Sequence, residues 1–147
     1  MKRQARQSGF SLIEIMVVLV IMGLLVGIVA PNVLDNLSKA NTQKVFADFK
    51  NIETALQSYR LDNYVYPTSE QGLNALMEKP TLDPVPRKFP QGGYVKKAFN
   101  DPWNREYLYL SPGESHEYDI FTYGADGVPG GEGENADISV WDNPNDF

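Results

Sequence analysis

The sequence predicts an α+β protein in which one long N-terminal helix packs on a small antiparallel sheet. Three observations support this fold class. Residues 10–30 form an apolar run with a single charge, and apolar side chains recur every three or four positions through residues 45–59. Short alternating segments, typical of strands, follow only in the last third of the chain. The 147 residues are 42% hydrophobic and 22% charged, which excludes a chain disordered throughout.

The apolar run from Phe10 to Ala30 is long enough to cross a membrane, and residues 10–31 are predicted to form a membrane-spanning helix. As a helix its 21 residues span about 31 Å, the thickness of the hydrocarbon core of a bilayer. A secretory signal peptide has a shorter apolar region and a cleavage site after it, whereas Pro31 follows this run. Three bases precede the run, so the positive-inside rule places the N-terminus in the cytoplasm. The alternative is a buried core helix.

Residues 32–66 are predicted to continue the apolar run as an amphipathic helix. A helix from Phe10 to Tyr59 would be about 75 Å long, more than a compact domain of this size needs, so we expect a scaffold element. Pro31 removes a backbone hydrogen bond and is expected to kink or locally open this helix. The apolar side chains that repeat at helical spacing are Val45, Phe49, Ile52, Leu56 and Tyr59.

Residues 67–147 are expected to form a globular head. The pair Tyr66-Pro67 should end the long helix, because the residue before a proline avoids helical geometry. A short helix is predicted over residues 69–77. Three strands are predicted at residues 107–110, 118–123 and 138–141.

Charge and cysteine usage exclude several classes of function. Residues 101–147 hold eleven acids and one base, Arg105, so the head repels phosphate and a nucleic-acid partner is excluded. The chain has no cysteine, which excludes a disulfide framework, a thiolate zinc site and a cysteine nucleophile. The single histidine, His116, lies between Ser115 and Glu117, and neighbouring residues in a turn point apart. We therefore expect no catalytic relay there and no enzyme.

Glu14 is the one charge within the apolar run. A carboxylate inside a membrane helix costs roughly 2.5–3.5 kcal/mol, so such a residue usually has a partner. We expect Glu14 to pair with a cation of this chain or of a neighbour, unless it lies close enough to the membrane surface to reach water.

The segment Gly9-Phe10-Ser11-Leu12-Ile13-Glu14 resembles the processing site of type IV pilins and type II secretion pseudopilins. The resemblance implies that residues 1–9 are a leader, that a prepilin peptidase cuts between Gly9 and Phe10, and that Phe10 is then N-methylated. Such a cut creates an α-amino cation that Glu14 can pair with, in the same chain or in a neighbour. It also implies that Glu14 and Pro31 act in assembly.

The acidic glycine loop, residues 123–137, is the candidate ligand site of the head. It holds four carboxylates and five of the twelve glycines. Calcium prefers six to eight oxygen ligands on an adaptable backbone, and a cation would offset the repulsion between these acids. The spacing of an EF-hand is absent. A solvated acidic loop without a metal is the alternative.

Further motifs resemble the major pseudopilins of type II secretion systems over nearly the whole chain: Tyr66-Pro67-Thr68, Gln71-Gly72-Leu73, Asp101-Pro102-Trp103 and Gly124-Ala125-Asp126-Gly127. The chain lacks the C-terminal cysteine pair of disulfide-looped type IV pilins. Asn104 stands where the family usually has glycine, and asparagine tolerates the positive φ that the turn needs. The resemblance implies one calcium ion in the loop, with these candidate ligands: Asp126, Asp137, the carbonyl of Tyr123, Glu134 and Asn135.

The resemblance also implies a pilin-like fold and a function in assembly. We expect a single-pass inner-membrane protein with its head in the periplasm, which leaves the lipid and polymerises into a periplasmic helical fibre that drives the export of folded proteins. The implied partners are other copies of the chain, minor pseudopilins, the prepilin peptidase and methyltransferase, and the inner-membrane assembly platform. The alternatives are a minor pseudopilin, a type IV pilin, and a membrane-anchored calcium-binding module that does not polymerise.

Overall fold

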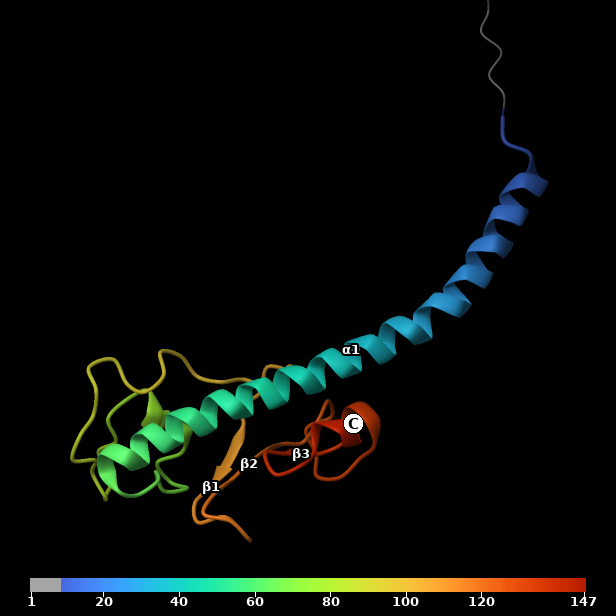
Figure 1. The fold of residues 1–147 in the computed structure, drawn as a ribbon. Helices are drawn as coiled ribbons and strands as arrows, with labels where there is room; N and C mark the ends of the chain where they lie inside the picture. Colours follow the sequence, from blue (N-terminus) through green and yellow to red (C-terminus); the bar gives the residue numbers. More distant parts are fainter. Residues whose placement is uncertain (1–8) are drawn as a thin grey trace, which may run out of the picture. The chain divides into compact units, whose positions relative to one another are not determined.

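The structure is a computed structural model that describes residues 9–147, apart from the side chains at positions 30–32, 34 and 35. Nearly all of the predicted leader, residues 1–9, lies outside the described residues. The chain divides into two compact units, one up to Leu37 and one from Ser38 to Phe147. Figure 1 shows the long helix and the strands of the second unit. Helix α1, Leu12–Asn63, contributes to both units.

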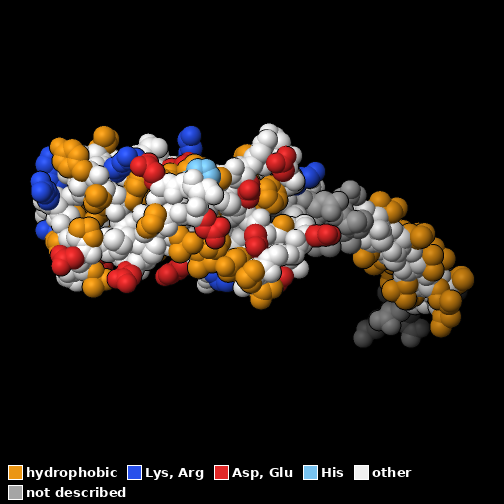
Figure 2. Space-filling model, turned by 90° about the horizontal axis from the view of Figure 1, so that it is seen from below, with side chains coloured by type: hydrophobic (Ala, Val, Ile, Leu, Met, Phe, Trp, Pro, Cys, Tyr) orange, Lys and Arg blue, Asp and Glu red, His pale blue; other side chains and the backbone are white. Residues whose placement is uncertain are grey.

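The described part of the first unit is the apolar half of α1. The window Leu12–Val29 is long and apolar enough to cross a membrane, and none of it is buried. Figure 2 shows hydrophobic side chains covering this part of the helix. Helical structure continues through Pro31 without a break, so the predicted kink stays a prediction. An apolar helix surface without cover from its own chain needs lipid or other protein around it.

The second unit contains a three-stranded antiparallel sheet in the order β1-β2-β3. Its strands are β1, Leu108–Leu110, β2, Asp119–Thr122, and β3, Ile138–Ser139. Each strand lies within the segment predicted for it and is shorter than that segment. The long helix and this sheet confirm the predicted α+β fold class.

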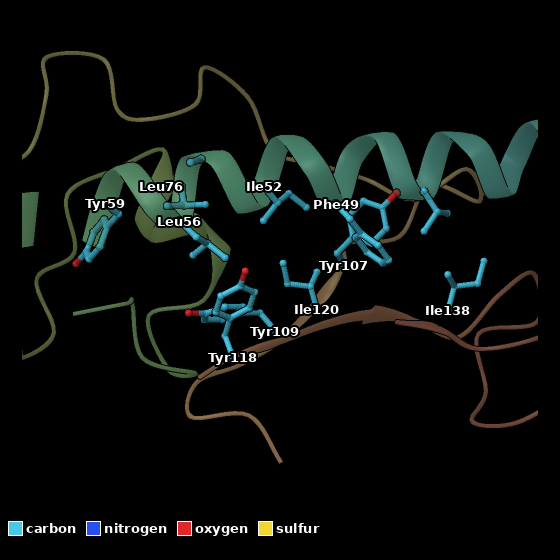
Figure 3. Close-up of a cluster of buried hydrophobic side chains, with 12 residues drawn as sticks. Phe49, Ile52, Leu56, Tyr59, Leu76, Tyr107, Tyr109, Tyr118, Ile120 and Ile138 are labelled. Carbon is cyan, nitrogen blue, oxygen red and sulfur yellow. The ribbon is translucent and has the colours of Figure 1, made fainter. Parts of the chain in front are cut away.

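The core of the second unit lies between α1 and the sheet (Figure 3). All five apolar side chains of the predicted helical stripe, from Val45 to Tyr59, are buried. The spacing of three and four residues puts them on one face of the helix, and that face meets the sheet. The buried residues opposite the helix include Tyr107, Tyr109, Tyr118, Ile120 and Ile138.

Helix α1 ends at Asn63, three residues before the predicted boundary. Tyr64 adopts a left-handed conformation, with φ 67°, and its N–H donates to the Arg60 carbonyl at 2.6 Å. This residue terminates the helix before Pro67 can do so. The next element is a single 3₁₀ turn, η1, Leu73–Leu76, where the sequence predicted a longer helix over residues 69–77.

Candidate functional site

The predicted processing site lies at the exposed start of the described chain. Phe10 is 81% exposed, and a Cβ built at Gly9 would have no described atom within 4 Å. Glu14 lies in the first turn of α1, where its N–H donates to the Ser11 carbonyl at 3.0 Å. Within residues 9–147 the Glu14 carboxylate has no cationic partner. A cation that neutralises it must therefore come from the chain before residue 9, from processing, or from another molecule.

The acidic glycine loop connects β2 to β3 and is closed by its own backbone. The Ala125 N–H donates to the Glu134 carbonyl at 2.7 Å, and the Gly127 N–H donates to the Tyr123 carbonyl at 3.2 Å. A Cβ at Gly124, whose φ is 60°, would lie 2.6 Å from the backbone of Asn135. Glycine is required there because the start of the loop lies directly against its end.

The structure places the five predicted ligands in this loop without clustering their carboxylates. Asp126 accepts from the Val128 N–H at 3.1 Å, and Asp137 accepts from the Gly130 N–H at 2.9 Å. Glu134 and Asn135 lie in the exposed 3₁₀ turn η2, Gly133–Asn135. Among the described residues, no three acidic or histidine side chains are grouped so that they could hold a metal ion. A metal in this loop would therefore need oxygen ligands besides carboxylates, such as backbone carbonyls or the Asn135 amide.

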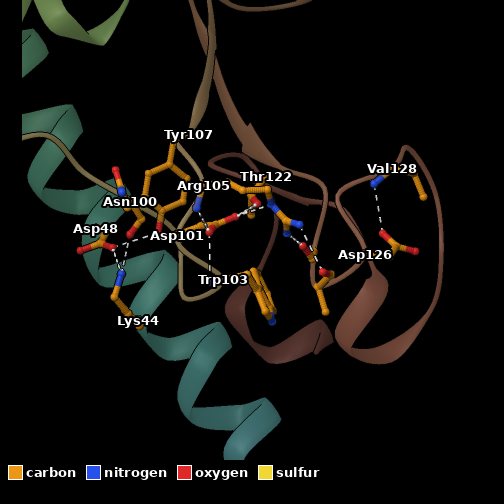
Figure 4. A network of polar contacts seen from close by, with 12 residues as sticks. Lys44, Asp48, Asn100, Asp101, Trp103, Arg105, Tyr107, Thr122, Asp126 and Val128 are labelled. Carbon is orange, nitrogen blue, oxygen red and sulfur yellow. Dashed lines mark hydrogen bonds and ion pairs between the residues drawn. The ribbon is translucent and has the colours of Figure 1, made fainter.

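Asp101, a buried carboxylate that the sequence did not single out, bonds Thr122, the residue just before the acidic glycine loop (Figure 4). The side chain of Asp101 is fully buried. Its Oδ1 accepts from the N–H groups of Trp103 at 3.0 Å and Arg105 at 2.8 Å, and its Oδ2 accepts from Thr122 Oγ1 at 2.8 Å. In the sequence, Asp101 stands out only as part of the Asp101-Pro102-Trp103 motif, although an aspartate that accepts from the N–H groups after it is a common turn pattern.

Arg105 connects that carboxylate to the loop. Its Nε lies 3.4 Å from Asp101 Oδ2, and its terminal nitrogens donate to the carbonyls of Gly124 and Ala125. The sequence signal for this contact was the presence of one base among eleven acids in residues 101–147.

Two family models match the chain. Residues 32–141 match the model described as type II secretion system protein G, and residues 4–30 match the prokaryotic N-terminal methylation motif. The chain belongs to the type II secretion system protein G family. The resemblance to the pseudopilins that the motifs indicated is thereby confirmed.

Relatives in this family match over most of their length. A type II secretion system core protein G of Vibrio cholerae is 52% identical over 147 residues, which cover 100% of this chain and 99% of the relative. The core protein G of Pseudomonas aeruginosa is 46% identical over 141 residues, 96% of this chain and 99% of the relative. The crystal structure of the major pseudopilin of enterohaemorrhagic Escherichia coli matches with a TM-score of 0.67 and 48% identity. That match covers 76% of this chain and 95% of the crystallised one.

The one histidine of this protein G family member takes part in a stack. His116 lies flat on Trp141, with ring centroids 4.0 Å apart and an interplanar angle of 17°. Its Nδ1 lies 3.9 Å from the Asp119 carboxylate, and the Trp141 indole N–H donates to the same carboxylate at 2.8 Å. These contacts hold the segment after β3 against the start of β2.

Proposed function

We propose that the chain is the major pseudopilin of a type II secretion system, the subunit that polymerises into the periplasmic pseudopilus. The observation that carries this proposal is the apolar surface of Leu12–Val29, none of which its own chain covers. The head, in contrast, has a complete core of its own. Membership in the protein G family and the methylation motif support this reading.

The two units have separate roles in this proposal. Before assembly, the apolar half of α1 anchors the subunit in the inner membrane, with the head in the periplasm. During assembly, the apolar helices of several copies replace the lipid around one another and form the core of a helical fibre. Growth of the fibre drives folded proteins toward the outer membrane. The minor pseudopilins, the prepilin peptidase and the assembly platform are separate proteins, and the energy for assembly also comes from outside this chain.

Processing explains the position of Glu14. Cleavage after Gly9 makes Phe10 the N-terminus, with an α-amino cation only a few residues from Glu14. In a staggered fibre, the same cation of a neighbour can neutralise this carboxylate. Breaking a buried ion pair by removing one partner costs roughly 3–5 kcal/mol.

The test compares Gly9→Asp with Gly9→Ala, and Glu14→Ala with the wild type, in cells that assemble the system. Gly9→Asp should stay at precursor size on a gel, whereas Gly9→Ala should be cut. Glu14→Ala should be inserted and cut but should yield few fibres. Normal cleavage of Gly9→Asp, or a normal fibre yield from Glu14→Ala, would contradict these roles.

Fibre composition separates the major subunit from the alternatives. A major pseudopilin forms the bulk of the purified polymer, while a minor pseudopilin is a trace component. A membrane-anchored module that does not polymerise stays monomeric after detergent extraction at every calcium concentration.

We further propose that the acidic glycine loop holds one calcium ion, which stabilises the fold of the head. The donor set supports this: carboxylates at Asp126 and Asp137, with backbone carbonyls of a tightly turning segment, are oxygen ligands of the kind calcium takes. The carbonyl of Tyr123 and the side chains of Glu134 and Asn135 complete the candidate ligands. When bound, the ion supplies charge neutralisation and no reaction chemistry.

A further inference from the structure

The guanidinium of Arg105 has partners on two sides. On one side, its Nε faces the fully buried carboxylate of Asp101 at 3.4 Å. On the other side, one terminal nitrogen donates to the Ala125 carbonyl at 3.2 Å and the other donates to the Gly124 carbonyl. Figure 4 shows the side chain extended between Asp101 and the start of the acidic glycine loop. A planar fork that donates to two adjacent carbonyls fixes their direction as well as their position.

Asp101, the carboxylate that faces the Arg105 guanidinium, is itself held in place. Asp101 accepts two backbone N–H groups and the hydroxyl of Thr122, at the end of β2, and it makes these contacts without exposure to water. Moving such a carboxylate would leave a buried charge without partners, which is strongly unfavourable. The ring of Trp103 lies 5.8 Å from the guanidinium carbon and adds a cation–π contact. Asp101 and Trp103 therefore hold the guanidinium of Arg105 in place beside the loop.

The first turn of the loop lies directly on the guanidinium. A Cβ built at Gly127 would lie 2.5 Å from a terminal nitrogen of Arg105, and the φ of Gly127 is 71°. A residue with a side chain would be strained there and would also displace the arginine. The absence of a side chain at Gly127 thus leaves the space that the Arg105 guanidinium fills.

We propose that Arg105 is the positioning residue of the acidic glycine loop, a clamp that holds its first turn, residues 123–127, in place whether or not a metal is bound. The guanidinium also brings a positive charge to a loop with four carboxylates, so it offsets part of their repulsion. This half of the inference depends only on the contacts of Arg105.

The other half rests on the proposed calcium site and narrows its ligands. Because the carbonyls of Gly124 and Ala125 already accept from Arg105, they are turned toward the protein. At this end of the loop, a cation can still reach the second oxygen of Asp126, whose other oxygen accepts from the Val128 N–H. It can also reach the second lone pair of the Tyr123 carbonyl, which accepts from the Gly127 N–H. Calcium then orders the second half of the loop, residues 128–137, more than the first.

The test measures local opening of the loop in the full chain in detergent. Endoproteinase Glu-C cuts after glutamate, so fragment masses report cuts after Glu132 and Glu134 in the loop separately from cuts upstream, at Glu114 and Glu117. The Ala125 N–H donates to the Glu134 carbonyl, so release of the first turn also frees the segment that holds the two cut sites. With a chelator present, Arg105→Met should therefore raise the rate of the loop cuts about tenfold, because the rate follows the population of the open form and a charge-assisted bond is lost. Upstream cuts should keep their rates.

The matched control is Arg87→Met, which removes an exposed arginine whose side chain makes no hydrogen bond or ion pair with any described residue. All loop cuts should keep the wild-type rate. If Arg105→Met fails to fold, Arg105→Lys decides, since it keeps the charge and loses the fork. Loop cuts at the wild-type rate, or equal acceleration at the upstream sites, would overturn the clamp. If the chelator-treated variant is cut faster but added calcium slows no cut in either protein, the clamp holds and the calcium site is wrong.

Discussion

The phenol of Tyr107 donates a hydrogen bond of 2.9 Å to the carboxylate of Asp48, a residue of α1 that precedes it by 59 positions. The same carboxylate oxygen accepts from Lys44 Nζ at 2.7 Å, and that ammonium also donates to the Asn100 carbonyl at 2.7 Å. The segment that leads into β1 is therefore held to the helix by charge-assisted bonds as well as by apolar contact. Burial, together with the Asp48 charge, raises the pKa of Tyr107.

Removing the Tyr107 hydroxyl should destabilise the head. We expect Tyr107→Phe to lower the free energy of unfolding by about 1.5–3 kcal/mol, the value of a hydrogen bond to a charged group. Thermal unfolding of the full chain in detergent, followed by near-UV circular dichroism, measures this change. The matched control is Tyr64→Phe: Tyr64 is 81% exposed, so its melting curve should superimpose on that of the wild type. A Tyr107→Phe curve that also superimposes would show that the bond adds no net stability.

The buried and half-buried tyrosines should make the head unstable in alkali. Burial, with a hydrogen bond to Asp62, raises the pKa of Tyr94 to about 12, and burial likewise raises the pKa values of Tyr107, Tyr109 and Tyr118. In the unfolded chain these phenols ionise near pH 10. Because the folded-state pKa is higher, their contribution to stability is complete below pH 10 and is lost as the pH rises above it.

We therefore expect the melting temperature to fall steadily from pH 10 toward pH 12. Tyrosinate absorbance, recorded on the same samples, should show part of the phenols ionising only as the head unfolds. Smooth ionisation of all eight tyrosines near pH 10, with the head still folded, would contradict the burial of these rings.

The spacing of apolar residues, together with the residues typical of turns, allowed the fold to be predicted from the sequence. The helical stripe required only the spacing from Val45 to Tyr59, and all three strands were found from alternation. The helix end was missed by three residues because Tyr64, a residue with a Cβ, adopts a left-handed φ that no propensity indicates. Asn104, with φ 67°, does take the positive φ that was expected of it.

The site was only partly predictable. Its candidate ligands all lie within residues 123–137, so composition alone pointed to the loop. The support from Asp101 and Arg105 comes from a segment about 20 residues earlier, and spacing along the chain does not reveal which carbonyls a guanidinium will reach. Contacts of that kind depend on the fold, which brings Thr122, at the end of β2, within hydrogen-bond distance of Asp101.

Truncating a leucine of α1 should lower the stability of the head only where that leucine belongs to the buried stripe. We expect Leu56→Ala, at a fully buried position, to lower the free energy of unfolding by about 2–5 kcal/mol, because lost burial and the remaining cavity both contribute. Leu61→Ala is the matched control on the same helix, since Leu61 is 80% exposed and should cost less than about 0.5 kcal/mol. Urea titration of both variants, with equal slopes, gives the comparison. Equal losses at the two positions would mean that the stripe does not carry the core.

Calcium should stabilise the head through the acidic glycine loop. A ligand that binds only the folded state adds about 2.7 kcal/mol at a hundredfold excess over its Kd, which corresponds to a melting shift on the order of 10 °C for a domain of this size. Chelator should remove this shift. Magnesium should restore little of it, because magnesium requires a tighter octahedral shell than a loose loop of carbonyls and carboxylates provides.

Asp126→Ala separates a calcium site from an acidic loop that merely repels itself. Losing a charged ligand should abolish the calcium shift, so this variant with calcium should melt like the wild type in chelator. Glu132→Gln, the matched control, removes the same charge from the same loop at a residue that is not a proposed ligand, and it should keep the shift. If relief of repulsion were the whole effect, both variants would raise the melting temperature in chelator, and neither they nor the wild type would respond to calcium. A calcium-induced rise in melting temperature for Glu132→Gln, together with no rise for Asp126→Ala, therefore distinguishes coordination from general electrostatics.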